Sequence, residues 1–308
     1  MVIKKVLLHE VISLLSDDIL QVYGNIEGRF INNITNVERV NENSLDWINP
    51  AKKEKQIIAE SSKAKALLVD DTLLYTNSIR SQGKILIVVK NPKLSLMKVL
   101  DSFFKEKPIP SIHPSTYVHP EAIIGEGVYI GPNCYIGKCI IGDNNIIHSN
   151  VCIYDRSVIG NNNEIHSGAL ICVDGLGCMR LNDKTLMEFP QIGGVVIGNN
   201  CYIGGNTHIA SGSLSDTIIG SGCKINGMCF IGSNDILHEN VWITGSTMLA
   251  GSVEVGKNTT LFSRVVVRDW CMIGEEAVVG MGSVVTKNIP NGETWLGTPA
   301  HKIEKNEK

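Results

Sequence analysis

The residues best suited to chemistry fall into two sets, defined by residue type and spacing. The stretch "INGMCFIGSNDILHEN", residues 225–240, offers the imidazole of His238 near the hydroxyl of Ser233 and the amides of Asn226 and Asn234. An imidazole takes up a proton near neutral pH and can act as a general base. His148 and His166 form the second set. What either set can do depends on the elements that position it.

Those elements are specified by an aliphatic repeat with a period of six, which begins near residue 112. Its last register contains twelve aliphatic residues in succession: Ile219, Ile225, Ile231, Leu237, Ile243, Leu249, Val255, Leu261, Val267, Ile273, Val279 and Val285. This period predicts a parallel β-helix, in which each hexapeptide forms one short strand and turn and three complete a triangular coil. Residues separated by three hexapeptides then stack. His148 and His166 have this separation and should share one corner, whereas His238 should lie at a different corner from Ser233.

The repeat is interrupted at residues 172–196 and again at 210–217. Insertions in repeat proteins often build the binding face, so we expect both to border a site. Residues 1–108 do not repeat, and their mixture of short apolar runs and helical patterns predicts a small α/β domain. We therefore expect a mainly β protein with an N-terminal domain (1–108), a β-helix (109–290) and a short tail (291–308).

Bulk composition excludes several classes. The net charge of −3 and the pI of about 6.2 do not favour a nucleic-acid partner. The nine cysteines form no CxxC pair and stand mostly beside aliphatic residues, which indicates buried thiols in a reducing compartment. The first apolar run is broken by His9 and Glu10, so we expect neither a signal peptide nor membrane insertion, and a cytoplasmic location.

Five segments each carry a longer motif of their own: "GKILIVVKNPKLSLMKVLDSFF", "IHPSTYVHPEAIIGEGVYIGPNCYIG", "IIHSNVCIYDRSVIGNNNEIHSGALICVDGLG", "FPQIGGVVIGNNCYIGGNT" and "ITGSTMLAGSVEVGKN". Together they resemble the bacterial UDP-3-O-acylglucosamine N-acyltransferase family and the wider hexapeptide-repeat sugar acyltransferases. The resemblance implies a nucleotide-binding N-terminal domain and a left-handed β-helix. It also implies a homotrimer with sites between neighbouring subunits, an acyl thioester donor and a sugar amine acceptor.

The chain departs from that family at three places. The family's catalytic Asp and His correspond to Asn226 and Ser233, so the usual base and its partner are both missing. Of the aromatic pair that brackets uracil, Trp47 remains but Lys52 replaces the tyrosine, which leaves UDP and dTDP sugars both open. The family's helical C-terminal extension is replaced by "GETWLGTPAHKIEKNEK", which is similar to the tail near coenzyme A in hexapeptide acetyltransferases.

The resemblance assigns further roles residue by residue. Asp174 and Gln191 match loops beside the acceptor, and Ser233 and Asn234 match the reacting centre. Apart from the resemblance, His166 lies just before the long insertion, so we expect it to contact the substrate. His238 could replace the missing base if the corner of a neighbouring subunit completes the site. Open backbone for a pantetheine arm is expected at five positions: Gly251, Gly280, Gly282, Gly297 and Pro299. A zinc site would need three converging histidines, which the spacing does not provide, so we expect no metal.

Loss of the base favours nitrogen over oxygen as the acceptor, because a neutral amine attacks a thioester more readily than a hydroxyl does. The leading hypothesis is an N-acyltransferase that moves an acyl group, most simply acetyl from acetyl-CoA, to a nucleotide-linked amino sugar for surface-glycan synthesis. One alternative is hydroxyacyl transfer from acyl carrier protein, as in lipid A synthesis. Another is a non-catalytic homologue that binds a nucleotide sugar without turnover.

Overall fold

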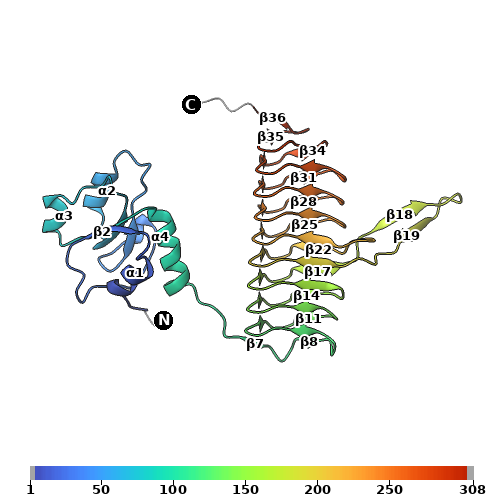
Figure 1. The fold of residues 1–308 in the computed structure, drawn as a ribbon, viewed down its shortest axis with the longest axis horizontal. Helices are drawn as coiled ribbons and strands as arrows, with labels where there is room; N and C mark the ends of the chain where they lie inside the picture. Colours follow the sequence, from blue (N-terminus) through green and yellow to red (C-terminus); the bar gives the residue numbers. More distant parts are fainter. Residues whose placement is uncertain (1–3, 304–308) are drawn as a thin grey trace. The chain divides into compact units, whose positions relative to one another are not determined.

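The chain forms two compact units, residues 1–107 and 108–308, in a computed structural model that describes residues 4–303 (Figure 1). The first is a small α/β unit, and the second is a parallel β-helix made of short strands. The predicted mainly β fold is therefore confirmed. The left-handed winding of the coil stays a prediction from the resemblance.

The N-terminal unit is built on a four-stranded sheet in the order β2–β6–β5–β4. Every residue of β5 and β6 is buried, as expected for their continuous apolar runs. The first helix, α1, begins only at Leu8, because Val6 and Leu7 form a strand that pairs with β3. The elements of this unit are β1 (Val6–Leu7), α1 (Leu8–Leu14), β2 (Ile19–Tyr23), β3 (Phe30–Ile31), a 3₁₀ turn (Val37–Arg39), β4 (Leu45–Trp47), α2 (Lys55–Ser61), β5 (Ala66–Val69), α3 (Asn77–Ser81), β6 (Ile85–Val89), α4 (Pro92–Val99) and a π-helical turn (Leu100–Phe104).

The β-helix has three faces, which the chain visits in the order first, second, third in each coil. The first face consists of β7 (Ser111–Ile112), β10 (Tyr129–Ile130), β13 (Ile146–Ile147), β16 (Glu164–Ile165), β21 (Tyr202–Ile203), β24 (Lys224–Ile225), β27 (Trp242–Ile243), β30 (Thr260–Leu261), β33 (Val278–Val279), β35 (Thr294–Leu296) and β36 (His301–Lys302).

The second face consists of β8 (Tyr117–Val118), β11 (Tyr135–Ile136), β14 (Cys152–Ile153), β17 (Leu170–Val173), β22 (His208–Ala210), β25 (Phe230–Ile231), β28 (Met248–Leu249), β31 (Val266–Val267) and β34 (Val284–Val285). The third consists of β9 (Ile123–Ile124), β12 (Ile140–Ile141), β15 (Ser157–Ile159), β20 (Val195–Ile197), β23 (Thr217–Ile219), β26 (Ile236–Leu237), β29 (Glu254–Val255) and β32 (Met272–Ile273). We call the turns between faces edge 1–2, edge 2–3 and edge 3–1.

The inward register follows the period-six prediction. All twelve aliphatic residues of the last register are buried, and Ile225 pairs with Ile243 one coil on. Asparagines recur in the turns with positive φ, including Asn133, Asn144 and Asn150, because their short side chains tolerate the left-handed region. The register therefore fixes which residue reaches which edge, and with it the position of every candidate site residue.

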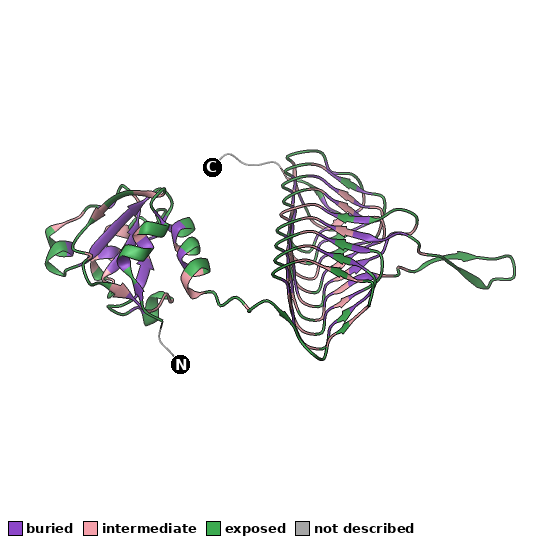
Figure 2. Ribbon diagram, turned by 60° about the horizontal axis from the view of Figure 1, so that its bottom comes forward, coloured by how far each residue is buried: buried purple, intermediate pink, exposed green. Residues whose placement is uncertain are grey.

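The two interruptions leave the coil where expected. The longer one forms a hairpin of β18 (Gly177–Arg180) and β19 (Leu186–Phe189), which projects from the β-helix and is exposed along both strands (Figure 2). The shorter one folds over edge 2–3. The described part of the predicted tail (291–308) extends the first face, because β35 pairs in parallel with β33 and β36 pairs antiparallel with β35.

Seven of the nine cysteines are buried and none forms a disulfide, in agreement with their interpretation as small core residues. Only Cys178, on the hairpin, is exposed. Among the described residues, no helix is long and apolar enough to cross a membrane.

Candidate functional site

The three catalytic candidates of residues 225–240 occupy three different edges of one coil. Asn226 follows β24 at edge 1–2, Ser233 follows β25 at edge 2–3, and His238 follows β26 at edge 3–1. The Asn226 side chain accepts a hydrogen bond from the backbone N–H of Gly227, 2.7 Å away. A single chain therefore does not unite Asn226, Ser233 and His238. The separation of His238 from Ser233 follows the prediction, whereas the resemblance implied that Asn226 and Ser233 would be partners.

Ser233 nevertheless has the loop partners that the sequence predicted. Its hydroxyl lies against Gly175 of the long insertion, so closely that a Cβ added at Gly175 would stand 2.2 Å from Ser233 Oγ. The same Cβ position is 3.7 Å from Gln191 Oε1. Gln191 donates from Nε2 to the carbonyl of Phe189, while its Oε1 is buried with no protein donor. A buried, unpaired acceptor at this point could receive an N–H or O–H of a substrate.

Asn234 ties the second interruption to the same edge. Its Nδ2 donates to the carbonyl oxygen of Ser215 at 2.9 Å and to Ser215 Oγ at 2.7 Å, and its Oδ1 accepts from the backbone N–H of Ser213. Its φ of +64° is one of the left-handed values that asparagine tolerates. Asn234 therefore shapes the loop, in addition to lining the groove described next.

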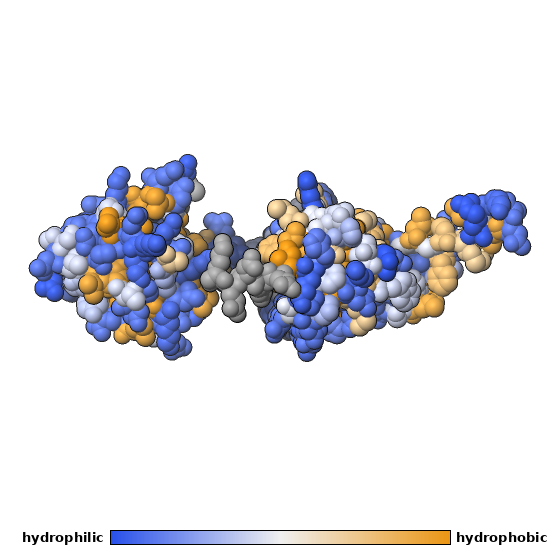
Figure 3. All heavy atoms as spheres, turned by 90° about the horizontal axis from the view of Figure 1, so that it is seen from above, coloured by the Kyte–Doolittle hydropathy of each residue, from blue (hydrophilic) through white to orange (hydrophobic). Residues whose placement is uncertain are grey.

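A groove of about 700 Å³ crosses the third face from this edge. Apolar side chains dominate its wall: Phe189, Leu214, Ile236, Trp270 and Met272. Phe189 comes from the hairpin, whose exposed apolar side chains also include Leu176, Met179 and Met187 (Figure 3). Among the lining residues, Glu254 is the one ionisable group. A groove of this size and polarity suits an acyl chain or a pantetheine arm.

Glu254 connects the groove to His238. Its Oε1 lies 2.8 Å from His238 Nε2, and both side chains are partly exposed. When Nε2–H donates to the carboxylate, Nδ1 keeps the lone pair and can accept a proton. The sequence analysis identified His238 but not Glu254. The available signal for Glu254 was its position just under one coil after His238.

Edge 2–3 also has a polar recess of about 410 Å³, formed by coils that precede Ser233 in the chain. Tyr135, Tyr154, Arg156 and Asp174 line it. Asp174 Oδ1 accepts from Arg156 Nη2 and from Ser211 Oγ, both at 3.2 Å. Paired charges beside tyrosine rings can bind a hydroxylated, phosphorylated ligand. Asp174 thus lies on the same edge as Gln191 and Ser233, while Arg156 was missed by the sequence analysis.

A buried carboxyl lies beneath this edge. Asp235 Oδ2 accepts from the backbone N–H of Gly232 at 2.6 Å, and Oδ1 accepts from that of Val253 at 2.8 Å. Burial raises the pKa of Asp235 to about 7, although the two backbone donors act in the opposite direction. Its proton occupancy should therefore change within the pH range in which such proteins are handled.

The glycines expected to contact coenzyme A separate into two groups. Gly251 is at edge 2–3, where a Cβ would lie 3.4 Å from the Ser233 carbonyl oxygen. Gly280, Gly282, Gly297 and Pro299 lie together near the end of the β-helix, where Gly297 N–H donates to Ser283 Oγ and Thr298 Oγ1 donates to the Gly282 carbonyl. Within one chain, Gly251 and the C-terminal group flank opposite sides of the second face.

The residues predicted to bind the nucleotide base, Trp47 and Lys52, lie in the N-terminal unit. Trp47, at the end of β4, is only half-buried but packs against the core cluster that includes Leu45 and Leu68. Lys52 is exposed in the following turn. Because part of the Trp47 ring serves the core, its proposed role in stacking on a nucleotide base stays a prediction.

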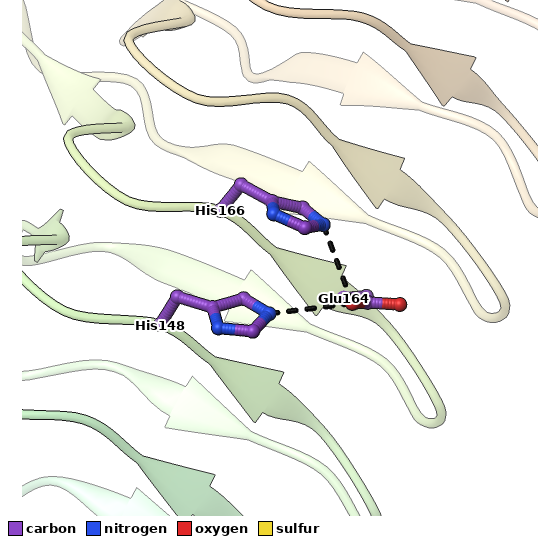
Figure 4. Close-up of side chains that lie close together, drawn as sticks. All are labelled: His148, Glu164 and His166. Atoms are coloured by element: carbon purple, nitrogen blue, oxygen red, sulfur yellow. Dashed lines mark hydrogen bonds and ion pairs between the residues drawn. The ribbon is translucent and has the colours of Figure 1, made fainter. Parts of the chain in front are cut away.

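His166 does not lie on edge 2–3 with the acceptor residues. It stacks on His148 with ring centroids 4.5 Å apart, as the spacing of the two histidines predicted, and its ring lies tilted against that of Tyr202 at the same distance. Glu164 points between the two histidines, with its Oε1 3.3 Å from Nε2 of each (Figure 4). The prediction from the sequence used histidines alone and did not include this carboxylate. The available signal was that residues 164 and 166 must point to the same side of a strand.

Known acyltransferases resemble the chain in sequence and in structure. The model of the bacterial transferase hexapeptide family (six repeats) matches residues 109–138 and 138–172. The UDP-3-O-acylglucosamine N-acyltransferase of Coxiella burnetii is 29% identical over 72% of this chain and 69% of that protein. A probable mitochondrial UDP-3-O-acylglucosamine N-acyltransferase 2 of Arabidopsis thaliana is 35% identical over 54% of this chain and 48% of its own. The crystal structure of a UDP-N-acetylglucosamine acyltransferase from Bacteroides fragilis aligns with TM-score 0.57 and 28% identity, over 63% of this chain and 74% of that one.

Proposed function

Since this chain is an acyltransferase of the hexapeptide-repeat family, we propose that it transfers an acyl group from acyl-CoA to the amino group of a nucleotide-linked amino sugar. The observation that carries the proposal is the arrangement along edge 2–3. A polar recess with Arg156 and Asp174, the unpaired acceptor of Gln191 beside Ser233, and an apolar groove adjoin one another there. Each part suits one portion of the two substrates.

The sugar nucleotide would occupy the polar recess. Arg156 can pair with a phosphate, and the tyrosine rings can pack on the sugar. A sugar hydroxyl would then donate to Gln191 Oε1, and the acceptor amine would reach into the groove that crosses the third face toward Glu254. The relatives named above act on UDP sugars according to their names, and this supports a nucleotide sugar without deciding between UDP and dTDP.

The thioester would lie in the apolar groove with its carbonyl near Glu254. The amine nitrogen attacks the carbonyl carbon, the carbon–sulfur bond breaks, and the product is an amide plus a free thiol. The proton lost by nitrogen passes to His238 Nδ1, while Glu254 holds the imidazole through Nε2 and stabilises its charged form. This pair would replace the base that is missing at Ser233.

The groove is apolar but open, and the rim residue Trp270 is 76% exposed. A short acyl chain with its pantetheine arm would cover this surface, which favours acetyl-CoA over a long hydroxyacyl donor. The glycines near the end of the β-helix would receive the rest of the coenzyme from a neighbouring subunit, which makes a homotrimer part of the proposal. Use of acyl-CoA also implies a cytoplasmic location, where this donor is made.

The test is release of free thiol from acetyl-CoA by the full chain with a panel of UDP- and dTDP-linked amino sugars. The proposal predicts turnover with at least one amino sugar, and none with the matching sugars that carry a hydroxyl in place of the amine. Turnover only with a hydroxyacyl carrier protein would favour the lipid A type of reaction. Sugar binding without turnover of any donor would identify a binding homologue instead.

A further inference from the structure

The cluster formed by His148, Glu164 and His166 has no role in the proposed transfer, and it has the composition of a metal centre. Its three donor atoms lie within 4.8 Å of one another (Figure 4). Both imidazoles present Nε2 to the same carboxylate oxygen. We propose that these three side chains bind one divalent transition-metal ion, for which zinc is the best match.

The spacing of the donors fits a tetrahedral ion. Donors bound to zinc at about 2.0–2.2 Å are roughly 3.3–3.5 Å apart when their geometry is tetrahedral. Glu164 Oε1 is 3.3 Å from Nε2 of His148 and 3.3 Å from Nε2 of His166. Two of the three separations therefore already have the required length, and a small rotation of the stacked imidazoles would adjust the third.

The fold holds the histidines in place before any ion binds. His148 and His166 occupy equivalent positions in consecutive coils, and the register of β13 and β16 fixes their backbones. His166 is also packed between His148 and Tyr202. A preformed site loses little conformational entropy on binding, because the rotamers of the ligands are already restricted.

The donor set also selects the kind of ion. Two imidazole nitrogens and one carboxylate oxygen suit zinc and related transition metals, whereas magnesium and calcium prefer oxygen ligands alone. The three side chains are 21–32% exposed, so water can reach a fourth position. Three protein ligands with one open position is the arrangement common in catalytic zinc sites.

An ion pair without metal explains the cluster less completely. Without an ion, protonating both imidazoles would place two positive rings 4.5 Å apart in a stack. A divalent ion satisfies both nitrogens and the carboxylate at once. This inference departs from the expectation of no metal, which considered histidines alone and did not include Glu164.

The test is titration of chelator-treated full-length protein with Zn²⁺, in competition with a chromophoric chelator, followed by the visible spectrum of the Co²⁺ form. A Cys178→Ser background removes the one exposed thiol. We expect one Zn²⁺ per chain, a tetrahedral Co²⁺ spectrum without thiolate bands, and no comparable binding of Mg²⁺. His148→Ala, Glu164→Gln and His166→Gln should each weaken Zn²⁺ binding by at least about 100-fold, since losing even an outer-shell partner costs 10–100-fold.

His113→Ala is the matched control, because it removes an exposed imidazole outside the cluster and should leave zinc affinity unchanged. If the cluster variants fail to fold, the thermal midpoint of the parent protein decides, since Zn²⁺ but not Mg²⁺ should raise it with concentration. Less than one zinc per chain, or an affinity that the folded cluster variants leave unchanged, would overturn the proposal. So would the absence of a zinc-dependent thermal shift.

Discussion

Two histidine–glutamate pairs in this β-helix have the same spacing but different surroundings. Glu164 follows His148, and Glu254 follows His238, by the same interval of just under one coil. In each pair a turn imidazole therefore meets a strand carboxylate of the next coil. The first pair lies by the first face and edge 1–2, and the second by the third face and edge 3–1. The fold thus builds the same local pair twice.

The position two residues after the glutamate separates the pairs. It is His166 in the first pair and Gly256 in the second. A Cβ at Gly256 would stand 2.5 Å from the backbone nitrogen of Glu275, so that corner has no room for a third donor. The first pair thereby gains the third donor of the proposed metal site. The second pair has no such donor, and its imidazole is the proposed proton acceptor. One residue thus separates the two proposed roles.

Removing the imidazole of the second pair should have the largest effect on the reaction. His238→Ala is expected to lower kcat for thiol release by about 10²–10⁴-fold, the usual contribution of a general base. Steady-state kinetics with the best amino sugar would measure it. His113→Ala, which removes an imidazole far along the chain from the groove, should retain the parent rate, and a His238→Ala rate equal to it would refute the assignment.

The buried carboxyl of Asp235 should make stability, rather than catalysis, depend on pH. Because the pKa of Asp235 is raised to about 7 in the folded state, from 3.8, the folded chain holds a proton that the unfolded chain loses. Its contribution is fully present below pH 4 and declines as pH rises toward 7, by a few kcal/mol at about 1.4 kcal/mol per pKa unit.

Denaturant unfolding between pH 4 and pH 8 would detect this decline, with Asp235→Asn as the variant in which it should disappear. Asp155→Asn, at an exposed turn of an earlier coil, should keep the parent dependence. If Asp235→Asn unfolds with the same pH dependence as the parent, the titrating group lies elsewhere.

Neutralising the carboxylate of the second pair should have a smaller effect than removing its imidazole. Glu254→Gln keeps the size of the side chain but no longer stabilises an imidazolium, which is worth about 1.5–3 kcal/mol and hence about 10–100-fold in kcat. Because the imidazole remains, kcat should fall while KM for acyl-CoA changes little. Glu126→Gln, in an exposed turn, serves as the control. A Glu254→Gln variant with the parent kcat would separate the carboxylate from proton transfer.

The smallest effect should come from the rim of the groove. Trp270→Ala is expected to raise KM for acyl-CoA by about tenfold, the equivalent of about 1.4 kcal/mol, because an indole that packs on the donor is lost. The turnover rate at saturation should be retained. A matched variant of Trp242, on the first face, should change neither constant. An unchanged KM in Trp270→Ala would place the donor elsewhere.

The repeat made the coil and its edges predictable, because an inward aliphatic residue every six positions fixes the register of each strand. The stacking of His148 on His166, the ejected insertions and the separation of His238 from Ser233 all follow from that register. Glu164 and Glu254 were missed because a carboxylate in a strand carries no signal by itself; only its place just under one coil after a turn histidine does. The contact of Gly175 with Ser233 depends on how the long insertion folds back, which no local pattern encodes.

In the proposed reaction the proton is accepted by the pair of His238 and Glu254, and not by the residue at the position of Ser233. The most direct test is the single-turnover rate of amide formation with acetyl-CoA and the best amino sugar, measured side by side for Ser233→Ala and His238→Ala. We expect a rate at least about 100-fold below the parent for His238→Ala, and one within about tenfold for Ser233→Ala, which removes a neutral hydroxyl worth at most about one ordinary hydrogen bond to the substrate. The reverse order would contradict the proposed reaction and return the chemistry to edge 2–3.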